Sequence, residues 1–435
     1  MPEVHVHQVD NGVTNQPETA DEKPAEASKW TVVTAAGAVL LIGVGYTNTF
    51  GVFSNYYQTH LLANDPPEKI ILIGSVASSL HFILGAFTGR FADLVGYRVS
   101  LMLGAALMVA SLFAASVSTT FWQLFLSQGL TFGLGLAFVY MPTTTISRQY
   151  FGARMHGLAN GIIISGGALG GCILPYCVDL MMAKFGLAQT FRILGYIAIG
   201  VLVPSTFFLK PRASQGSRRT GPVFDVELLK NQRFLWLLAA CTIAMVGFLP
   251  RYLLIPSSAE AKGIGSTYAS WLLGLMNGLS IIGRVGIGYL SDRLGKVTAL
   301  TLSFLLCGIG HVVFWLPAVS LQDANTETAI ALFTLFVVFV GVLGSGFISL
   351  FPVVVADMFG SENLASKTGL LNTAVGFGTL AGPSAVYAII GSGMQRKWMA
   401  GVLTAGLLML VGGILLSAMS APWNKIKRRT GAESV

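Results

Sequence analysis

Charged residues are scarce in this sequence of 435 residues. Asp, Glu, Lys and Arg together make up 11% of it, whereas apolar residues make up 53%. Charged residues are ordinarily about a quarter of a soluble protein. The scarcity excludes an ordinary water-soluble enzyme or binding module and favours a chain that lies largely within a lipid bilayer.

Several other features are missing. The four cysteines all fall in apolar stretches, so no disulfide framework is predicted, and no Asn-x-Ser/Thr sequon offers a site for an N-glycan. No metal-ligand cluster, nucleophile elbow or ATP-binding motif is found. We therefore expect neither an enzyme nor a cofactor.

Long apolar runs fill most of the chain instead. A membrane span needs about 20 predominantly apolar residues. Twelve such runs are found, and this even number places both termini on the same side of the membrane. They cover approximately residues 30–54, 70–91, 98–117, 122–145, 157–182, 188–209, 233–256, 269–290, 297–319, 328–355, 367–390 and 398–420.

The placement of the basic residues predicts the orientation. Of 27 Lys and Arg, 19 lie in the two tails and the even-to-odd loops, six lie in the other loops, and two lie within spans. Because cytoplasmic loops are rich in Lys and Arg, both termini are predicted to be cytoplasmic, in a multi-pass protein of the plasma membrane. The net charge of +8 is explained by this bias, and no nucleic-acid partner is expected.

An internal repeat divides the chain into two halves. The segment "GRFADLVGYR" at residues 89–98 recurs as "GYLSDRLGK" at residues 288–296, which is six spans later. A basic, Gly- and Pro-containing stretch separates the copies. The predicted divisions are a disordered cytoplasmic tail (1–29), a six-helix half (30–209), a cytoplasmic linker (210–232), a second six-helix half (233–420) and a basic cytoplasmic tail (421–435).

The repeated motif has the composition of a gate. An Asp at the end of one helix can cap the N-terminus of a neighbouring helix and pair with a nearby cation, and glycines let the backbones approach. The alternative is a tight turn with surface charges, which two copies at equivalent positions disfavour. The predicted gate residues are Gly89, Asp93, Gly96 and Arg98 in one copy and Gly288, Asp292, Arg293, Gly295 and Lys296 in the other.

On these residues the sequence resembles the major facilitator superfamily of secondary transporters, which carry this motif between the second and third helices and repeat it in the second half. The segments at 150–175, 346–360 and 368–383 are also similar to monocarboxylate porters, especially the fungal members. The resemblance implies an all-α polytopic protein with twelve helices in two six-helix halves, working by alternating access.

Arg284 is the first candidate for binding a substrate. Asn277 and Ser280 precede it by seven and four residues, so the three lie on one helix face. A guanidinium stays charged and matches the geometry of a carboxylate, which predicts an anion site in a cavity between the halves. The alternative is a structural arginine that pairs with backbone carbonyls or with a carboxylate on another helix.

The resemblance to monocarboxylate porters adds that an arginine at this position of the eighth helix engages the substrate carboxylate. Mammalian-type members also carry an Asp four residues earlier and a Lys in the first helix, both implicated in proton coupling. Here the matching residues are Ser280 and Asn48. A proton carrier of another kind is therefore required if transport is coupled to protons.

Other polar residues within spans are further candidates. Arg251 follows a proline in the seventh span, and either faces the cavity or extends to the outer headgroups. Tyr46 and Asn48 in the first span and Asn372 in the eleventh either orient a ligand or bond across a helix interface. His81 and His311 are mid-span proton-coupling candidates, and for each the alternative is a neutral core histidine.

The sequence thus predicts a secondary active or facilitative transporter of monocarboxylates or related organic anions, with a proton as a candidate co-substrate. The other transport hypothesis is export of a larger organic acid or secondary metabolite, which fungal relatives of this type also serve. A non-transporting nutrient sensor is a third alternative, which the short tails disfavour.

Overall fold

The computed structural model describes residues 26–152, 155–209, 226–321, 326–390 and 397–430, and in these ranges the chain is helical without strands. The N-terminal half, as used below, consists of α1 (Glu26–Asn48), α2 (Phe50–Tyr56), the π-helix η1 (Tyr57–Leu61), α3 (Pro67–Ile83), α4 (Gly85–Val95), α5 (Tyr97–Ala115), α6 (Phe121–Leu124), the π-helix η2 (Phe125–Thr131), α7 (Phe132–Thr145), α8 (Ser147–Tyr150) and α9 (His156–Phe208).

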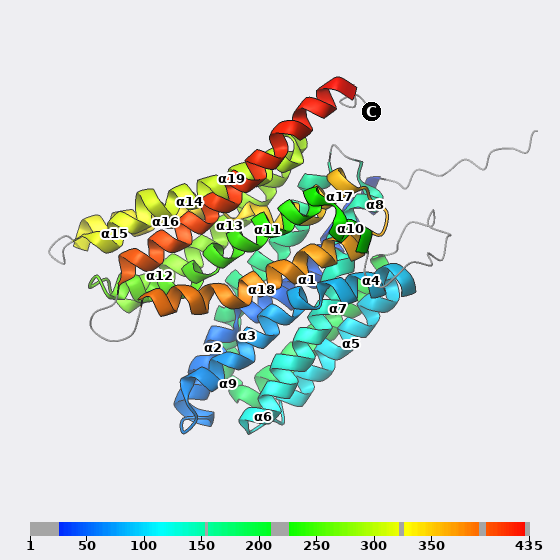
Figure 1. The fold of residues 1–435 in the computed structure, drawn as a ribbon. Helices are drawn as coiled ribbons and strands as arrows, with labels where there is room; N and C mark the ends of the chain where they lie inside the picture. The colour runs from blue at the N-terminus through cyan, green and yellow to red at the C-terminus, as the bar shows by residue number, and fades with distance from the viewer. Residues whose placement is uncertain (1–25, 153–154, 210–225, 322–325, 391–396, 431–435) are drawn as a thin grey trace, which may run out of the picture.

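The C-terminal half follows the segment 210–225, which lies outside the described residues (Figure 1). It consists of α10 (Val226–Lys230), α11 (Gln232–Phe248), α12 (Pro250–Glu260), α13 (Ser266–Leu294), α14 (Lys296–Gly310), the π-helix η3 (His311–Trp315), α15 (Leu316–Ser320), α16 (Thr326–Leu343), the 3₁₀-helix η5 (Gly346–Leu350), α17 (Phe351–Phe359), α18 (Leu364–Ile390) and α19 (Trp398–Thr430).

The described helices cover all twelve of the apolar runs. Nine helices in the described ranges are long and apolar enough to cross a membrane, and α3 with α4 forms a tenth, bent span. The 53-residue α9 is broken at Gly186, where φ is +76°, so it supplies two spans. The 27-residue α18, which is not one of these nine helices, covers the eleventh run. The chain is an all-α polytopic membrane protein.

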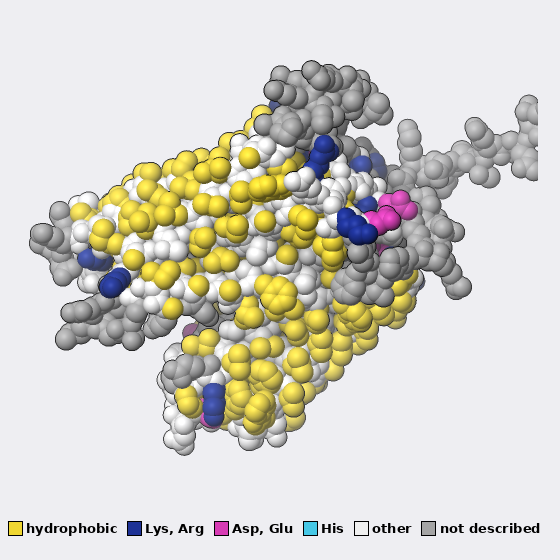
Figure 2. Space-filling view, viewed as in Figure 1, with side chains coloured by type: hydrophobic (Ala, Val, Ile, Leu, Met, Phe, Trp, Pro, Cys, Tyr) yellow, Lys and Arg dark blue, Asp and Glu magenta, His cyan; other side chains and the backbone are white. Residues whose placement is uncertain are grey.

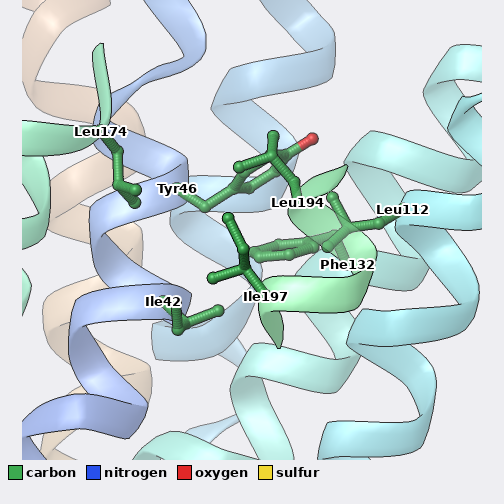
Figure 3. A pocket seen from close by; sticks show the side chains of 7 residues that line it. All are labelled: Ile42, Tyr46, Leu112, Phe132, Leu174, Leu194 and Ile197. Atoms are coloured by element: carbon green, nitrogen blue, oxygen red, sulfur yellow. The ribbon is translucent and has the colours of Figure 1, made fainter. Parts of the chain in front are cut away.

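The break at Gly186 sends the chain back along itself. Leu174 precedes the break by 12 residues and Leu194 follows it by eight, yet both line one small pocket with Ile42 of α1 (Figure 3). The two legs of α9 therefore lie side by side against α1. A glycine is suited to this turn because φ near +76° is strained for residues with a Cβ.

The predicted tails differ in extent from the observed helices. α1 begins at Glu26, so the last four residues of the predicted tail are helical, and α19 continues to Thr430, into the predicted C-terminal tail. Residues 1–25 and 431–435 lie outside the described residues. The predicted linker contains the short α10.

Each half has its own apolar core, and the halves meet at one end. Buried apolar residues form one cluster within residues 32–209, joined by Ala365, and another within residues 237–416. Figure 1 shows the halves diverging toward α12 and α15 on one side and α2 and α6 on the other. In Figure 2 charged side chains lie mostly toward the ends of the molecule, with an apolar belt between them, as a bilayer requires.

Candidate substrate site and gate

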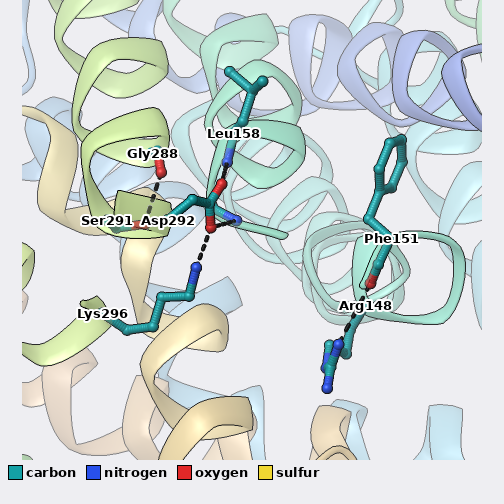
Figure 4. A network of polar contacts seen from close by, with 8 residues as sticks. Arg148, Phe151, Leu158, Gly288, Ser291, Asp292 and Lys296 are labelled. Atoms are coloured by element: carbon teal, nitrogen blue, oxygen red, sulfur yellow. Dashed lines mark hydrogen bonds and ion pairs between the residues drawn. The ribbon is translucent and has the colours of Figure 1, made fainter. Parts of the chain in front are cut away.

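Asp292 closes the end where the halves meet. Its carboxylate, at the end of α13, accepts hydrogen bonds from the backbone N–H groups of Gly157 (3.0 Å) and Leu158 (2.9 Å), at the start of α9 in the other half (Figure 4). Lys296 of α14 forms an ion pair with the same carboxylate. A negative charge on free N–H groups at a helix N-terminus is stabilising, so this contact ties the halves together.

Asp93 makes the equivalent contact in the other direction. At the end of α4 in the N-terminal half, it accepts hydrogen bonds from the backbone N–H (2.8 Å) and the hydroxyl (2.7 Å) of Ser366, in the first turn of α18. Each half thus contributes an aspartate that caps a helix of the other. We call these two contacts and the glycines beside them the gate.

Glycines make the close approach possible. A Cβ at Gly89 would lie 2.1 Å from the carbonyl oxygen of Ala365, and one at Gly288 would lie 2.4 Å from that of Gly157. Gly96 and Gly295 have φ of +106° and +99° and begin the turns into α5 and α14. Gly89 and Gly288 therefore allow close helix packing, and Gly96 and Gly295 allow a backbone conformation that other residues rarely adopt.

The motif arginines lie outside these contacts. Arg98 is exposed and its guanidinium lies 5.2 Å from the ring centroid of Phe207, and the exposed Arg293 lies 4.7 Å from that of Tyr289. Lys296 is the motif cation that pairs with Asp292.

Asp93→Asn is expected to loosen the gate, because the amide keeps hydrogen-bonding capacity but loses the charge at the N-terminus of α18. A cysteine at buried Ser291, in the other gate contact, reports opening by its alkylation rate when Cys172 and Cys177 are replaced by Ser. We expect the rate to rise about tenfold, as for loss of a charged hydrogen bond. Asp65→Asn serves as the control. It removes the solvent-accessible ion pair with Lys69 and should leave the alkylation rate unchanged. An unchanged rate in Asp93→Asn would contradict the gate.

Arg284 lies between the halves, three turns from the gate end of α13. It is 7% exposed, and Nη1 donates a hydrogen bond to the backbone carbonyl of Ile164 in α9 (2.9 Å). Its Nε is buried without an acceptor. Among the described residues no carboxylate pairs with it. A buried cation without a countercharge is costly, and an anionic ligand would remove that cost.

Three side chains that the sequence did not single out lie within electrostatic reach of Arg284: Tyr140 of α7, Cys172 of α9 and Tyr252 of α12. They come from both halves. Tyr252 also accepts a hydrogen bond from Arg251 (3.4 Å). Nothing in the local sequence marks these residues, because their proximity depends on how four helices pack.

The other residues of the predicted stripe differ in exposure. Ser280 is fully buried and its hydroxyl donates to the carbonyl of Asn277 (2.7 Å), while Asn277 is half-buried. Asn48 is exposed on α1, and a Cβ at Gly171 would lie 2.8 Å from its amide nitrogen. Asn48 thus lies beside the stretch of α9 that carries Cys172.

Arg251 is enclosed by other side chains. It is fully buried inside the C-terminal half, where its guanidinium donates to Cys307 Sγ (3.2 Å) and Ser345 Oγ (3.2 Å) and lies 3.8 Å from the ring centroid of Phe248. The ring and these polar neighbours surround the guanidinium where a proline breaks the seventh span, and its Nε is buried without a hydrogen-bond partner among the described residues.

Tyr46 and Asn372 are also buried. Tyr46 lines the small apolar pocket of Figure 3 within the N-terminal half, with its ring centroid 4.2 Å from that of Phe132. Asn372 of α18 is 2% exposed, its Nδ2 lies 3.7 Å from Met141 Sδ across the interface, and its Oδ1 has no partner. Asn372 therefore contacts the other half, and Tyr46 does not.

The two histidines have different surroundings. His81 of α3 is buried, with its ring centroid 4.9 Å from that of Tyr140. His311 is fully buried in the C-terminal half, where Nδ1 lies 2.7 Å from the carbonyl of Cys307 and the ring packs on Trp315 and Phe336. Through Tyr140, His81 adjoins the surroundings of Arg284, whereas His311 packs in the core.

These features are typical of a membrane transporter: two pseudo-equivalent halves, reciprocal helix caps between them, and a buried cation that pairs with no carboxylate among the described residues. The chain belongs to the Major Facilitator Superfamily, whose family model matches residues 35–326 and 252–433.

The curated relatives are fungal transporters. The chain is 30% identical over 400 residues to the MFS-type transporter pynF of Aspergillus niger, covering 92% of this chain and 89% of the relative. It is 27% identical to the aspyridones efflux protein apdF of Emericella nidulans, covering 95% and 83%, and 28% identical to the agnestins efflux protein AgnL12 of Paecilomyces divaricatus, covering 88% and 86%.

The fold also matches a solved structure. A bacterial homologue of the iron transporter ferroportin, crystallised in an outward-facing state, superposes with a TM-score of 0.71 at 13% identity, covering 91% of this chain and 99% of that one. At this identity the match concerns the fold alone.

Proposed function

We propose that the protein exports an organic acid, such as an acidic secondary metabolite, by alternating access, with Arg284 binding the acidic group. The observation that carries this proposal is that Arg284 is buried between the halves and pairs with no carboxylate among the described residues. Two relatives whose names state a cargo, apdF and AgnL12, are efflux proteins, which favours export.

A small monocarboxylate is the second candidate. The lone guanidinium fits a single carboxylate, and the similarity of the segments at 150–175, 346–360 and 368–383 to monocarboxylate porters supports this substrate class. Asn277, Ser280, Asn48 and Asn372 are the polar side chains that we propose for orienting the substrate, together with Tyr140 and Tyr252.

We also propose an orientation in the membrane. We place the gate and both termini in the cytosol and the protein in the plasma membrane, because the Lys- and Arg-rich loops lie at the gate end. In this orientation the closed gate makes the structure outward-facing, which is the state from which an exporter releases its substrate.

Proton coupling, if present, is assigned to His81 rather than His311. His81 stacks edge-on against Tyr140, which lies within electrostatic reach of Arg284. A proton on His81 and an anion on Arg284 would therefore influence each other across the interface.

Transport by purified protein in proteoliposomes tests the function. Labelled monocarboxylates and larger organic acids are offered with and without a pH gradient. We expect counterflow of at least one acid, and gradient-driven accumulation that His81→Gln removes while His311→Gln retains it. Flux of small monocarboxylates alone would establish the second candidate, and no flux of any acid in either direction would refute the anion site.

A further inference from the structure

The span formed by α3 and α4 is bent by 52° at Leu84, without a proline at the break. Sharp kinks arise at prolines, at small-residue pairs, at π-bulges, or where a side chain enters the backbone hydrogen-bond ladder. Gly85 follows the break and permits close packing, but a glycine alone leaves helical backbone bonds available. The bend therefore calls for a specific partner.

That partner comes from the opposite half. The hydroxyl of Thr373, on α18, donates to the backbone carbonyl of Ile83 (2.9 Å) and accepts from the backbone N–H of Ala86 (2.9 Å). In a continuous helix both groups would bond within the helix, four residues away. One hydroxyl thus replaces two ladder bonds, in a bilayer where unsatisfied backbone groups are costly.

The bend is linked to the gate because both depend on α18. Ser366, two turns before Thr373, is held by Asp93 at the end of α4. Between these points α18 touches α4 closely, since a Cβ at Gly369 would lie 2.0 Å from the carbonyl oxygen of Gly85. Separation of the halves would withdraw Asp93 and Thr373 contacts together.

The equivalent interface lacks a bend. There the hydroxyl of Ser165 in α9 lies 3.3 Å from the carbonyl of Ile281 and bonds its own helix at Gly161 (2.7 Å), while α13 runs unbroken for 29 residues and carries Arg284. This difference between the two interfaces indicates that the contact with Thr373, and not the repeated motif, causes the bend.

We propose that Thr373 is a positioning residue that holds the α3–α4 span bent while the gate is closed, and that the span straightens when the gate opens. Released, Ile83 and Ala86 regain partners within their own helix, which offsets the lost contact. His81 lies three residues before the break, so the change would move it relative to Tyr140. The inference rests on opening of the gate and is independent of the substrate.

The bend can be measured within one half by pulsed electron paramagnetic resonance. Spin labels replace Ile71 of α3 and Leu94 of α4, which are 51% and 48% exposed. Straightening should lengthen their separation by about 3 Å, from the helical rise. We expect Thr373→Val to increase the longer population and to raise alkylation of a cysteine at Ser291 about tenfold, as for two lost buried hydrogen bonds.

Two controls separate this role from general packing. Thr373→Ser keeps the hydroxyl and should restore both readouts. Thr379→Val removes a hydroxyl of the same helix that bonds only its own backbone, at Val375, and should change neither. If the distance between the labels at positions 71 and 94 were as short in Thr373→Val as in the unaltered protein, the proposal would be overturned. These readouts need no substrate, so absence of transport in the unaltered protein would refute the proposed function separately.

Discussion

Arg284→Lys is expected to lower transport of the acidic substrate by about tenfold to a hundredfold, the effect of losing a hydrogen bond to a charged group. Lysine keeps the positive charge but lacks the planar fork that holds a carboxylate with two parallel bonds. The measurement is initial counterflow in proteoliposomes. Arg293→Lys on the same helix is the control, because Arg293 is exposed and lies over Tyr289, and transport should be unchanged.

Stability distinguishes a ligand-binding arginine from a structural one. Arg284 is buried with one backbone hydrogen bond and with no carboxylate partner among the described residues. Arg284→Met should therefore leave the thermal midpoint of the ligand-free protein unchanged or raise it, while transport is lost. A structural arginine would give the opposite result, a lowered midpoint with transport reduced only in proportion to folded protein. That result would remove Arg284 from the proposed site.

Gly288→Val is expected to lower transport strongly by holding the gate open. The valine Cβ would lie 2.4 Å from the backbone carbonyl oxygen of Gly157, and a backbone atom in a packed helix cannot move aside cheaply. We expect flux at least about tenfold lower than normal. Spin labels at the exposed Thr59 and Glu260, at the opposite end of the two halves, should move closer together.

The matched control is two residues away. A Cβ at Gly286 meets no atom within 4 Å, so Gly286→Val carries the same change on the same helix without the overlap. It should transport normally with an unchanged Thr59–Glu260 distance. If both variants transported equally well, close approach at Gly288 would not be required for the transport cycle.

Much of the fold was predictable because it depends on local properties. Runs of about 20 apolar residues predict spans wherever they occur, and the repeated Asp93 and Asp292 predicted a pair of equivalent helix ends. The structure adds which helices they cap. Asp93 reaches Ser366, 273 positions later, and Asp292 reaches Gly157, 135 positions earlier.

The candidate site was predictable only in part. A charge within an apolar run indicates a buried ion whichever way it points, so Arg251 and Arg284 were both candidates. The polar stripe of Asn277 and Ser280 favoured Arg284. Packing separates them. Arg251 is enclosed by Phe248, Cys307 and Ser345 of its own half, and Arg284 faces α9 of the other.

The amino-acid sequence by itself determined that this chain spans a membrane in two related six-helix halves, with a charged motif repeated at equivalent helix ends. These properties follow from the order of apolar and charged residues along the chain. Only the tertiary structure decided that the aspartates cap helices across the interface and that Thr373 enters the backbone of another span. It also decided that Arg284 has no countercharge within the part of the chain that the structure describes. Those features arise between residues far apart in sequence, where the shape of packed helices selects each partner.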